Sequence, residues 1–335
     1  MLITALLAAT YLGNLACKPC HSVIYEDYAA SPMARTSGSV TTTPPGAYRG
    51  VLIDARGHAR WNAFDRKLDY FIGSGAHGRS YLTVRNGFLF QAPFTWYTQQ
   101  QRWDASPGFE NDNYLRWSRP IEPNCLWCHA SQPKPIYATV NRYADTPFAQ
   151  DGVSCERCHG PGSEHIREGA AMVNPARLDP ARRDAVCAQC HLSGEARIDK
   201  VGKRLAMYRP GELLSEYVTY FVADRGAMKA TSHYEKLGAS ACKKASGDKL
   251  WCGTCHSPHR PVSARDACLS CHQLESCNRG ADCVTCHMPK KRAIDGGHGV
   301  LSDHSILRRS AGDSASQDWA LQPWDGFNAT KRDFG

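Results

Sequence analysis

The segment Cys155-Glu-Arg-Cys-His-Gly-Pro-Gly-Ser-Glu-His165 decides how this chain folds, because it sets two cysteines and a histidine in the pattern Cys-x-x-Cys-His. The pattern occurs seven times and takes 14 of the 16 cysteines in a chain of 335 residues. The copies are Cys17/Cys20/His21, Cys125/Cys128/His129, Cys155/Cys158/His159, Cys187/Cys190/His191, Cys252/Cys255/His256, Cys268/Cys271/His272 and Cys283/Cys286/His287, numbered motifs 1 to 7 below. This pattern is the attachment signature of c-type haem.

The chemistry of haem attachment explains the spacing. Two thiols add to the two vinyl groups on one side of the porphyrin, and the next residue turns its imidazole under the iron. Structural zinc takes four ligands from two Cys-x-x-Cys pairs and does not need a histidine after each second cysteine. Seven adjacent cysteine pairs would also be an unusual disulfide framework. The motifs therefore predict seven covalently attached haem c groups.

The composition agrees with a core built around cofactors. The chain is 42% hydrophobic with 28 Gly and 19 Pro, and its mean hydropathy is −0.46. That is few apolar side chains for a large core in a chain of this length. We expect a multihaem cytochrome c fold, in which porphyrins supply most of the core and helices are short, with a small antiparallel β insertion between the first and second haems.

The number of remaining histidines matches the number of haems. Seven of the 14 histidines lie outside the motifs, and each is a candidate second axial ligand: His58, His77, His165, His233, His259, His298 and His304. Bis-histidine coordination throughout would leave no open iron, which favours electron transfer over catalysis. Met33 is an alternative second ligand near the first haem.

Two of these candidates are constrained by their position in the chain. His165 follows His159 through a Gly-Pro-Gly turn, and His259 follows His256 through Ser257 and Pro258. Each leaves from the proximal side of its own haem and cannot easily reach the distal side. Each is therefore expected to bind the iron of a neighbouring haem.

The motifs are unevenly spaced and suggest five regions: a short or shortened signal peptide (1–10), a first haem segment (11–38), a β-rich insertion (39–119), a six-haem core (120–310) and a tail (311–335). Strands are expected at 80–85 and 88–94 around Asn86-Gly87, a strong hairpin signal, with further strands of the same sheet at 59–64 and 68–72. Residues 37–46 have the composition of a linker, and short helices are expected at 180–189 and 213–223.

The N-terminus and the cofactor both indicate export. Residues 2–9 have the length of a signal-peptide core, and no run of about 20 apolar residues is present to span a membrane. Haem c is attached outside the cytoplasm, so we expect a periplasmic or extracellular protein. In that oxidising compartment Cys242 and Cys277 could form a disulfide or remain as two buried thiols.

The formal net charge of +8 does not indicate nucleic-acid binding. Each oxidised haem adds a net charge of about −1, because two propionates outweigh the ferric iron, so seven haems offset the basic chain. The expected partners are redox proteins or other cytochromes, with self-assembly as a further possibility.

Several segments resemble the multihaem cytochrome c family that includes the tetrahaem electron carrier of bacterial ammonia oxidation. They are Cys155–His165, Cys252–His259, Cys283–Pro289 and Asp303-His304; two more, Gly73–His77 and the segment around Met33, resemble longer members from soil bacteria. The resemblance implies that His165 and His259 are distal ligands of other haems. Many relatives have histidine where Met33 stands, and the chain lacks the Cys-x-x-Cys-Lys motif of pentahaem nitrite reductases.

We therefore expect a heptahaem cytochrome that carries electrons along closely packed, mostly bis-histidine haems, with no catalytic residues. One alternative is a subunit of a polymerising extracellular cytochrome filament. The other is a multihaem oxidoreductase in which one five-coordinate haem acts on a small nitrogen or sulfur compound.

Overall fold

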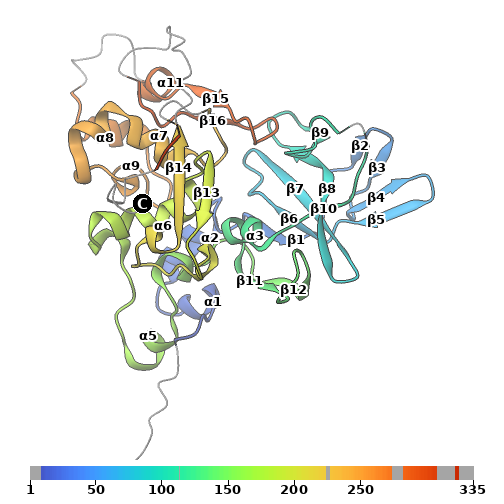
Figure 1. The fold of residues 1–335 in the computed structure, drawn as a ribbon, viewed down its shortest axis with the longest axis horizontal. Helices are drawn as coiled ribbons and strands as arrows, with labels where there is room; N and C mark the ends of the chain where they lie inside the picture. Colours follow the sequence, from blue (N-terminus) through green and yellow to red (C-terminus); the bar gives the residue numbers. More distant parts are fainter. Residues whose placement is uncertain (1–8, 113, 224–226, 274–281, 308–320, 324–335) are drawn as a thin grey trace, which may run out of the picture.

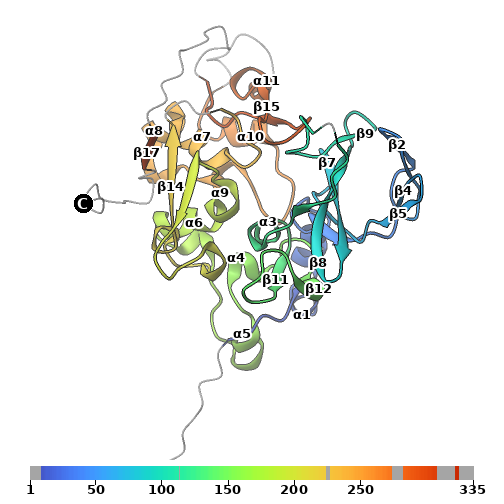
Figure 2. The same ribbon diagram turned by 45° about the vertical axis from the view of Figure 1, so that its right-hand side comes forward.

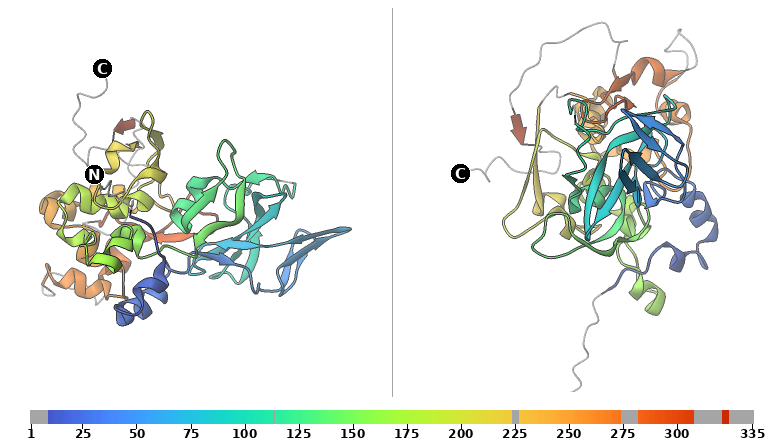
Figure 3. Two further views of the ribbon diagram at one scale, coloured as in Figure 1. Left: turned by 90° about the horizontal axis from the view of Figure 1, so that it is seen from below. Right: turned by 90° about the vertical axis from the view of Figure 1, so that its right-hand side faces the viewer.

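The computed structural model describes residues 9–112, 114–223, 227–273, 282–307 and 321–323. The described chain forms two parts that lie side by side (Figure 1). Strands β1 to β10 make up one part, and the other contains short helices with a few strands between them. Seen from below, the strands extend away from the helices (Figure 3).

The larger sheet of the β part is antiparallel and has the order β1-β6-β7-β8-β10, with β9 also paired to β8. Its strands are β1 (Ser37–Ser39), β6 (Tyr70–Ile72), β7 (Gly78–Arg85), β8 (Phe88–Tyr97), β9 (Arg102–Ala105) and β10 (Arg119–Pro120). The expected hairpin is confirmed: Arg85 pairs with Phe88, and Asn86 and Gly87 have φ values of 52° and 80°. Positive φ at both central residues is what a type I′ turn requires.

A second antiparallel sheet contains β2 (Gly46–Tyr48), β3 (Val51–Ile53), β4 (His58–Trp61) and β5 (Phe64–Lys67). It corrects two expectations. Residues 59–64 are not one strand, because the chain turns at Asn62, whose φ is 50°, and they lie outside the sheet that contains β6. Residues 37–46 are not only a linker, because β1 pairs with β6.

Aromatic side chains fill the core of the β part. Phe94 is fully buried, and its ring meets Trp103 and Trp117 edge to face at centroid distances of 5.5 and 5.4 Å. Tyr81 packs on Trp103 at 5.2 Å. Such contacts add to the stability gained by burying the rings, so this part has a core that contains no motif cysteine.

The helical part consists of short elements, as the density of Gly and Pro predicts. Its α-helices are α1 (Asn14–Cys17), α2 (Ser22–Ala29), α3 (Pro123–His129), α4 (Glu156–His159), α5 (Ser163–Glu168), α6 (Pro180–His191), α7 (His233–Ala239), α8 (Ala241–Ser246), α9 (Cys252–Cys255), α10 (Ala264–Leu269) and α11 (Cys283–His287). Four 3-10 turns accompany them: η1 (Pro175–Arg177), η2 (Leu205–Met207), η3 (Leu214–Glu216) and η4 (Gly247–Lys249). Helix α3 lies where the two parts meet (Figures 1 and 2).

Small antiparallel sheets connect these helices. They pair β11 (Ser131–Pro135) with β12 (Tyr143–Gln150), β14 (Val218–Ala223) with both β13 (Ala196–Asp199) and β17 (Leu321–Pro323), and β15 (Lys290–Arg292) with β16 (Val300–Ser302). The expected helix at 180–189 is confirmed as α6. The expected helix at 213–223 is wrong: only η3 is helical, and the β-branched and aromatic run Val-Thr-Tyr-Phe-Val forms β14.

An apolar cluster lies beside motifs 2, 4 and 5. It includes Leu205, Leu214 and Val218, which are at most 2% exposed, with Cys128, Cys190 and Cys252 packed against it. Residues 1–8, Cys277 and most of the tail after residue 307 lie outside the described residues, so the signal peptide and the Cys242–Cys277 disulfide remain predictions. The five region boundaries also remain predictions.

Candidate haem-binding sites

Most of the motifs lie on or at the end of a short helix. In motifs 1, 3, 5 and 6 the backbone N–H of the histidine donates to the carbonyl of the first cysteine, four residues earlier, at 2.8 to 3.0 Å. Residues three or four apart lie on one face of a helix. The two thiols and the imidazole of one motif therefore belong to one surface, as attachment to a flat macrocycle requires.

Helix caps fix where several motif helices begin. The Asp179 carboxylate accepts from the Arg182 N–H at the start of α6, which ends in motif 4. The Ser263 hydroxyl does the same for α10, and Asp282 for α11. These side chains satisfy N–H groups that have no partner inside the helix.

The motifs touch one another through their cysteines. Neighbouring thiols bring motif 1 next to 3, 2 next to 4, 4 next to 5 and 6 next to 7; the pairs within reach of each other are Cys17–Cys155, Cys128–Cys190, Cys187–Cys252 and Cys268–Cys283. Cys158 lies within electrostatic reach of Cys187 and Cys190, and Cys255 within reach of Cys271. All seven motifs thus form one connected cluster, although they are spread over 271 positions, from Cys17 to His287.

Some motif side chains are exposed. Cys20 of motif 1, His272 of motif 6 and Cys286 of motif 7 are exposed, as are Cys125 and Cys271. The side chains of Cys20, His272 and Cys286 make no hydrogen bond, ion pair or ring contact with the residues that the structure describes. The roles of these three residues in haem attachment and ligation therefore remain predictions from the motif alone.

A buried carboxylate brings motif 1 to motif 3. Glu156, within motif 3, is 1% exposed and accepts from the backbone N–H groups of Leu12, Gly13 and Gly162 at 2.8 to 3.1 Å. The Asn14 side chain accepts from the Cys155 N–H at 2.8 Å. Sequence reasoning missed this clamp, because a glutamate inside Cys-x-x-Cys reads as a variable residue.

Hydrogen bonds orient several of the histidines. Nδ1 of His159, His165, His287 and His304 donates to the carbonyl of Val173, Ala170, Leu307 and Ser302, at 2.6 to 3.0 Å. His129 Nδ1 shares a 2.9 Å hydrogen bond with the Thr36 hydroxyl. Holding one ring nitrogen in this way leaves Nε2 as the nitrogen that can bind a metal.

Desolvation by the surrounding protein lowers the pKa of six of the histidines. It lowers the pKa of His129 to about 4 and that of His233 to about 3, with a smaller contribution from the neighbouring His191. Burial also lowers the pKa of His191, His256, His259 and His304. Neutral imidazole is the form that binds metals, so these environments suit axial ligands at neutral pH.

Four spare histidines face a motif histidine. The ring centroids of His21 and His165 are 6.3 Å apart, those of His159 and His259 5.9 Å, and those of His256 and His304 6.0 Å, with interplanar angles of 20°, 12° and 30°. His191 faces His233 at 5.4 Å, with the rings nearly perpendicular. A metal–imidazole bond is about 2 Å and the ligating nitrogen is about 1 Å from the ring centre, so two imidazoles on opposite sides of one metal have centroids about 6 Å apart.

The other candidates are placed differently. His58 pairs with Asp65 at 2.8 Å on the sheet of β2 to β5, and His298 Nε2 pairs with Asp104 at 2.9 Å. His77 is exposed, with Gln99 3.3 Å from its Nδ1, and lies within electrostatic reach of His233. Met33 is half-buried, and its carbonyl accepts from the Val153 N–H just before motif 3. None of these three histidines makes a ring contact with a motif histidine within the part of the chain that the structure describes.

These donors suit haem c better than a bare ion. Paired thiols would hold a porphyrin covalently, and the facing imidazoles would bind its iron. Among the residues described, no three histidine, cysteine, aspartate or glutamate side chains form a group that could hold a metal ion. Haem c held this way would supply one-electron redox chemistry at its iron.

Comparisons with known proteins find similarity to cytochromes. Residues 98–160, which contain motifs 2 and 3, match the family model "Cytochrome c554 and c-prime". Multiheme cytochrome MtrA of Shewanella baltica (strain OS185) is 25% identical over 177 residues, which are 44% of this chain and 52% of MtrA, so the chain spans about half the length of this relative. The crystal structure of outer cell wall cytochrome OcwA matches with a TM-score of 0.60 at 17% identity, over 88% of this chain and 79% of OcwA.

No described helix has the length and apolar character needed to cross a bilayer. The repeated attachment motifs, the facing histidines and these three matches identify the chain as a multihaem c-type cytochrome.

Proposed function

We propose that this cytochrome binds seven haem c groups and carries electrons along them, with at least four haems ligated by two histidines. The observation that carries the proposal is the continuous contact between motifs, because electron tunnelling requires neighbouring redox centres to lie close together. The chain would hold each haem through two cysteines and orient its axial imidazoles through the hydrogen bonds at Nδ1. The proposed bis-histidine pairs are His21/His165, His159/His259, His256/His304 and His191/His233.

The pairing makes the haem cluster depend on long-range folding. His165 leaves motif 3 to face His21, while His259, just after motif 5, faces His159. Each iron in these pairs would be held between segments far apart in the sequence. Such sharing would fix the distance and angle between neighbouring porphyrins, which are held rigidly when both axial ligands belong to packed elements.

Two measurements test the haem count and the ligand pairs. The intact mass of the secreted protein should exceed that of the chain by seven haems. Electron paramagnetic resonance of oxidised H165A, H259A and H304A should each show one haem converted from low spin to high spin, whereas H58A should match the wild type. A spectrum in H165A, H259A and H304A that stays fully low spin would contradict these pairs.

A second candidate function rests on motif 2. The His129 ring is buried and neutral, yet no second histidine ring faces it among the described residues. A five-coordinate haem there would act as an oxidoreductase centre for a small molecule. A high-spin signal in the wild type that disappears on adding cyanide would support this function, and a fully low-spin wild type would exclude it.

We also propose that the protein works outside the cytoplasm and exchanges electrons with redox proteins or other cytochromes. The description of OcwA as an outer cell wall cytochrome supports this location. Fractionation of the producing cells, followed by haem staining, tests it.

A further inference from the structure

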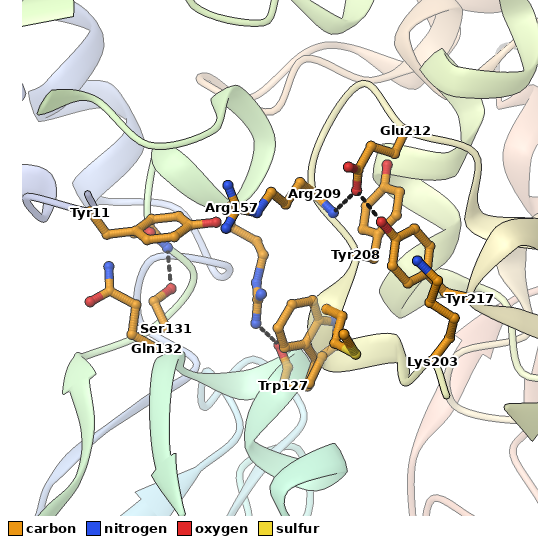
Figure 4. Close-up of a pocket in the computed structure, with 13 residues that line it drawn as sticks. Tyr11, Trp127, Ser131, Gln132, Arg157, Lys203, Tyr208, Arg209, Glu212 and Tyr217 are labelled. Atoms are coloured by element: carbon orange, nitrogen blue, oxygen red, sulfur yellow. Dashed lines mark hydrogen bonds between the residues drawn. The ribbon is translucent and has the colours of Figure 1, made fainter. Parts of the chain in front are cut away.

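A cavity of about 390 Å³ lies between α3, α4 and the segment that follows β13. Figure 4 shows Lys203 and Tyr208 to the right of Trp127 and Arg157, with the Arg209 side chain extending from the right toward Arg157. Trp127 and Arg157 each stand directly before the second cysteine of a motif. The cavity is therefore next to the places where the haems of motifs 2 and 3 would be attached.

Three residues that line this cavity each have a buried donor with no hydrogen-bond partner among the described residues: Trp127 Nε1, Arg157 Nε and Tyr208 OH. The Trp127 and Tyr208 side chains belong to residues that are only 6% and 2% exposed. A buried donor without a partner destabilises the folded protein, so nearly all such groups in native structures are satisfied. Three around one cavity indicate that a group with acceptor atoms occupies it.

The charge of the lining indicates that this group is an anion. Arg157, Lys203 and Arg209 form no ion pair within the described chain. The one carboxylate of the lining, Glu212, already accepts from the Arg209 backbone N–H and from the Tyr217 hydroxyl at 2.8 and 2.7 Å. Three cations and three unpaired donors thus surround a space in which a carboxylate, an acceptor-only group, would be held.

The arginine is fixed in place for this role. Its Nη2 donates to the Trp127 carbonyl at 2.6 Å, and its guanidinium lies over the Trp127 ring at 3.3 Å from the centroid. Stacking and the carbonyl bond together fix the plane of the guanidinium. Its Nε is left to donate to a ligand without further ordering of the side chain.

We propose that this cavity is an anion site that binds a carboxylate or a small oxyanion through Arg157, Tyr208, Trp127 and Lys203. The inference rests on the proposed haem attachment for one of its two sources, a propionate of a haem at motif 2 or 3. The other source is a free oxyanion from solution. Both present the same acceptor oxygens to the site.

The test compares the haem-loaded wild type with Y208F and K203M. Y208F removes only the unpartnered hydroxyl, and K203M removes one exposed charge. Y97F is the matched control, because the Tyr97 hydroxyl is also buried but donates to the Ala105 carbonyl in the β part. The melting temperature and the midpoint potentials of the haems are measured with and without sodium sulfate. Its sulfate ion is an oxyanion that is not reduced during the titration.

If a haem propionate occupies the site, Y208F lowers the melting temperature. Both Y208F and K203M then lower the midpoint potential of one haem, because they weaken the positive electrostatic potential that stabilises its reduced iron. In that case sulfate leaves the potentials unchanged and shifts the melting temperatures of the wild type, Y208F and K203M equally, through the general stabilisation by an excluded salt. If a free oxyanion occupies the site, sulfate raises the melting temperature of the wild type, and does so less in Y208F and K203M. Y97F lowers the melting temperature in either case but leaves the potentials and the sulfate response as in the wild type.

The site does not exist if Y208F melts at or above the wild-type temperature and neither Y208F nor K203M changes a potential or the sulfate response. Removing a hydroxyl that truly has no partner would give that result, because its desolvation cost disappears. A failure of the proposed function would look different, since the intact mass would then show fewer than seven haems in the wild type.

Discussion

Replacing Glu156 with glutamine should release the N-terminal segment that carries motif 1. The carboxylate is 1% exposed, and its two oxygens accept from the N–H groups of Leu12, Gly13 and Gly162. Glutamine keeps one acceptor oxygen and turns an NH₂ group toward one or more of these donors. The substitution is nearly isosteric, so the change tests the hydrogen bonds and not the packing.

The cost follows from the number of bonds affected. A hydrogen bond to a charged group contributes about 1.5–3 kcal/mol, a neutral one about 1 kcal/mol, and a buried donor left unpaired costs about 1–3 kcal/mol. E156Q should lower the free energy of opening this segment by about 3 kcal/mol, because it weakens the hydrogen bonds that glutamine retains and removes the one from the Gly13 N–H. Because Leu12 is 44% exposed, the segment can open locally without unfolding the rest of the protein.

Hydrogen–deuterium exchange followed by mass spectrometry measures this opening. About 3 kcal/mol corresponds to roughly 100-fold faster exchange for the amides of residues 10–30 that exchange through this local opening. The high-spin fraction should also rise, because the His21/His165 pair joins this segment to α5. E168Q is the control, because Glu168 is exposed and pairs with Arg167 at the surface. Equal exchange of residues 10–30 in E156Q, E168Q and the wild type would refute the clamp.

Three further predictions concern the scaffold. F94A should lower the free energy of unfolding of the β part by about 3–5 kcal/mol, since it leaves a cavity in place of a fully buried aromatic ring. Tryptophan fluorescence should record this loss, while the Soret band of the folded protein stays unchanged. A changed Soret band would contradict the prediction. G87A should cost about 1 kcal/mol, because residue 87 has a φ of 80°; an unaltered urea midpoint would contradict the hairpin assignment. The Arg182 side chain and then its backbone N–H lower the pKa of Asp179, so the stability that Asp179 contributes is present above the ordinary aspartate pKa and is lost as the pH falls through the lowered one. D179N should therefore reduce the fall in melting temperature with decreasing pH between about pH 5 and pH 3. The same slope of melting temperature against pH as in the wild type would contradict this prediction.

The sequence was most informative where chemistry sets the spacing of residues. The seven motifs needed only the attachment rule, and the Asn86-Gly87 hairpin followed from the requirement for positive φ. His165 and His259 were singled out because a histidine leaving one face of a haem must go to another haem. The structure places their rings opposite His21 and His159.

Reasoning from the sequence was weakest where tertiary context decides. Residues 213–223 have a composition that allows either helix or strand, and pairing with β13 and β17 selects the strand. The chain has seven spare histidines for seven expected haems, and this match in number does not distinguish one histidine from another. The structure distinguishes His58 and His298, whose rings pair with Asp65 and Asp104, because a nearby carboxylate cannot be inferred from the position of a histidine in the chain.

The repeat of one motif also hides differences in burial. The sequence treats the seven copies as equivalent, yet Cys158 and Cys190 are half-buried, whereas Cys20, Cys125 and Cys286 are exposed. Burial depends on which elements pack around a motif, and this information lies outside the five residues of the motif itself.

The contacts between motifs assign a particular place to α6. Its Cys187 and Cys190 meet Cys252 of motif 5 and Cys128 of motif 2, and both lie within electrostatic reach of Cys158 of motif 3. Motif 1 reaches the cluster through motif 3, whereas motifs 6 and 7 follow motif 5. Under the proposed function, the haem of motif 4 would thus connect the haems near the β part with those of the C-terminal motifs.

Helix α6 is the longest helix described, and a buried carboxylate anchors it. Asp184, 3% exposed, accepts from the Tyr234 hydroxyl at 2.8 Å and pairs with Arg183 at 3.0 Å. The first of these contacts fixes α7, whose first residue His233 faces His191. A junction of several haems tolerates less movement than a terminal one, since any displacement changes several interhaem distances together, and a capped helix with a buried, paired carboxylate supplies that rigidity.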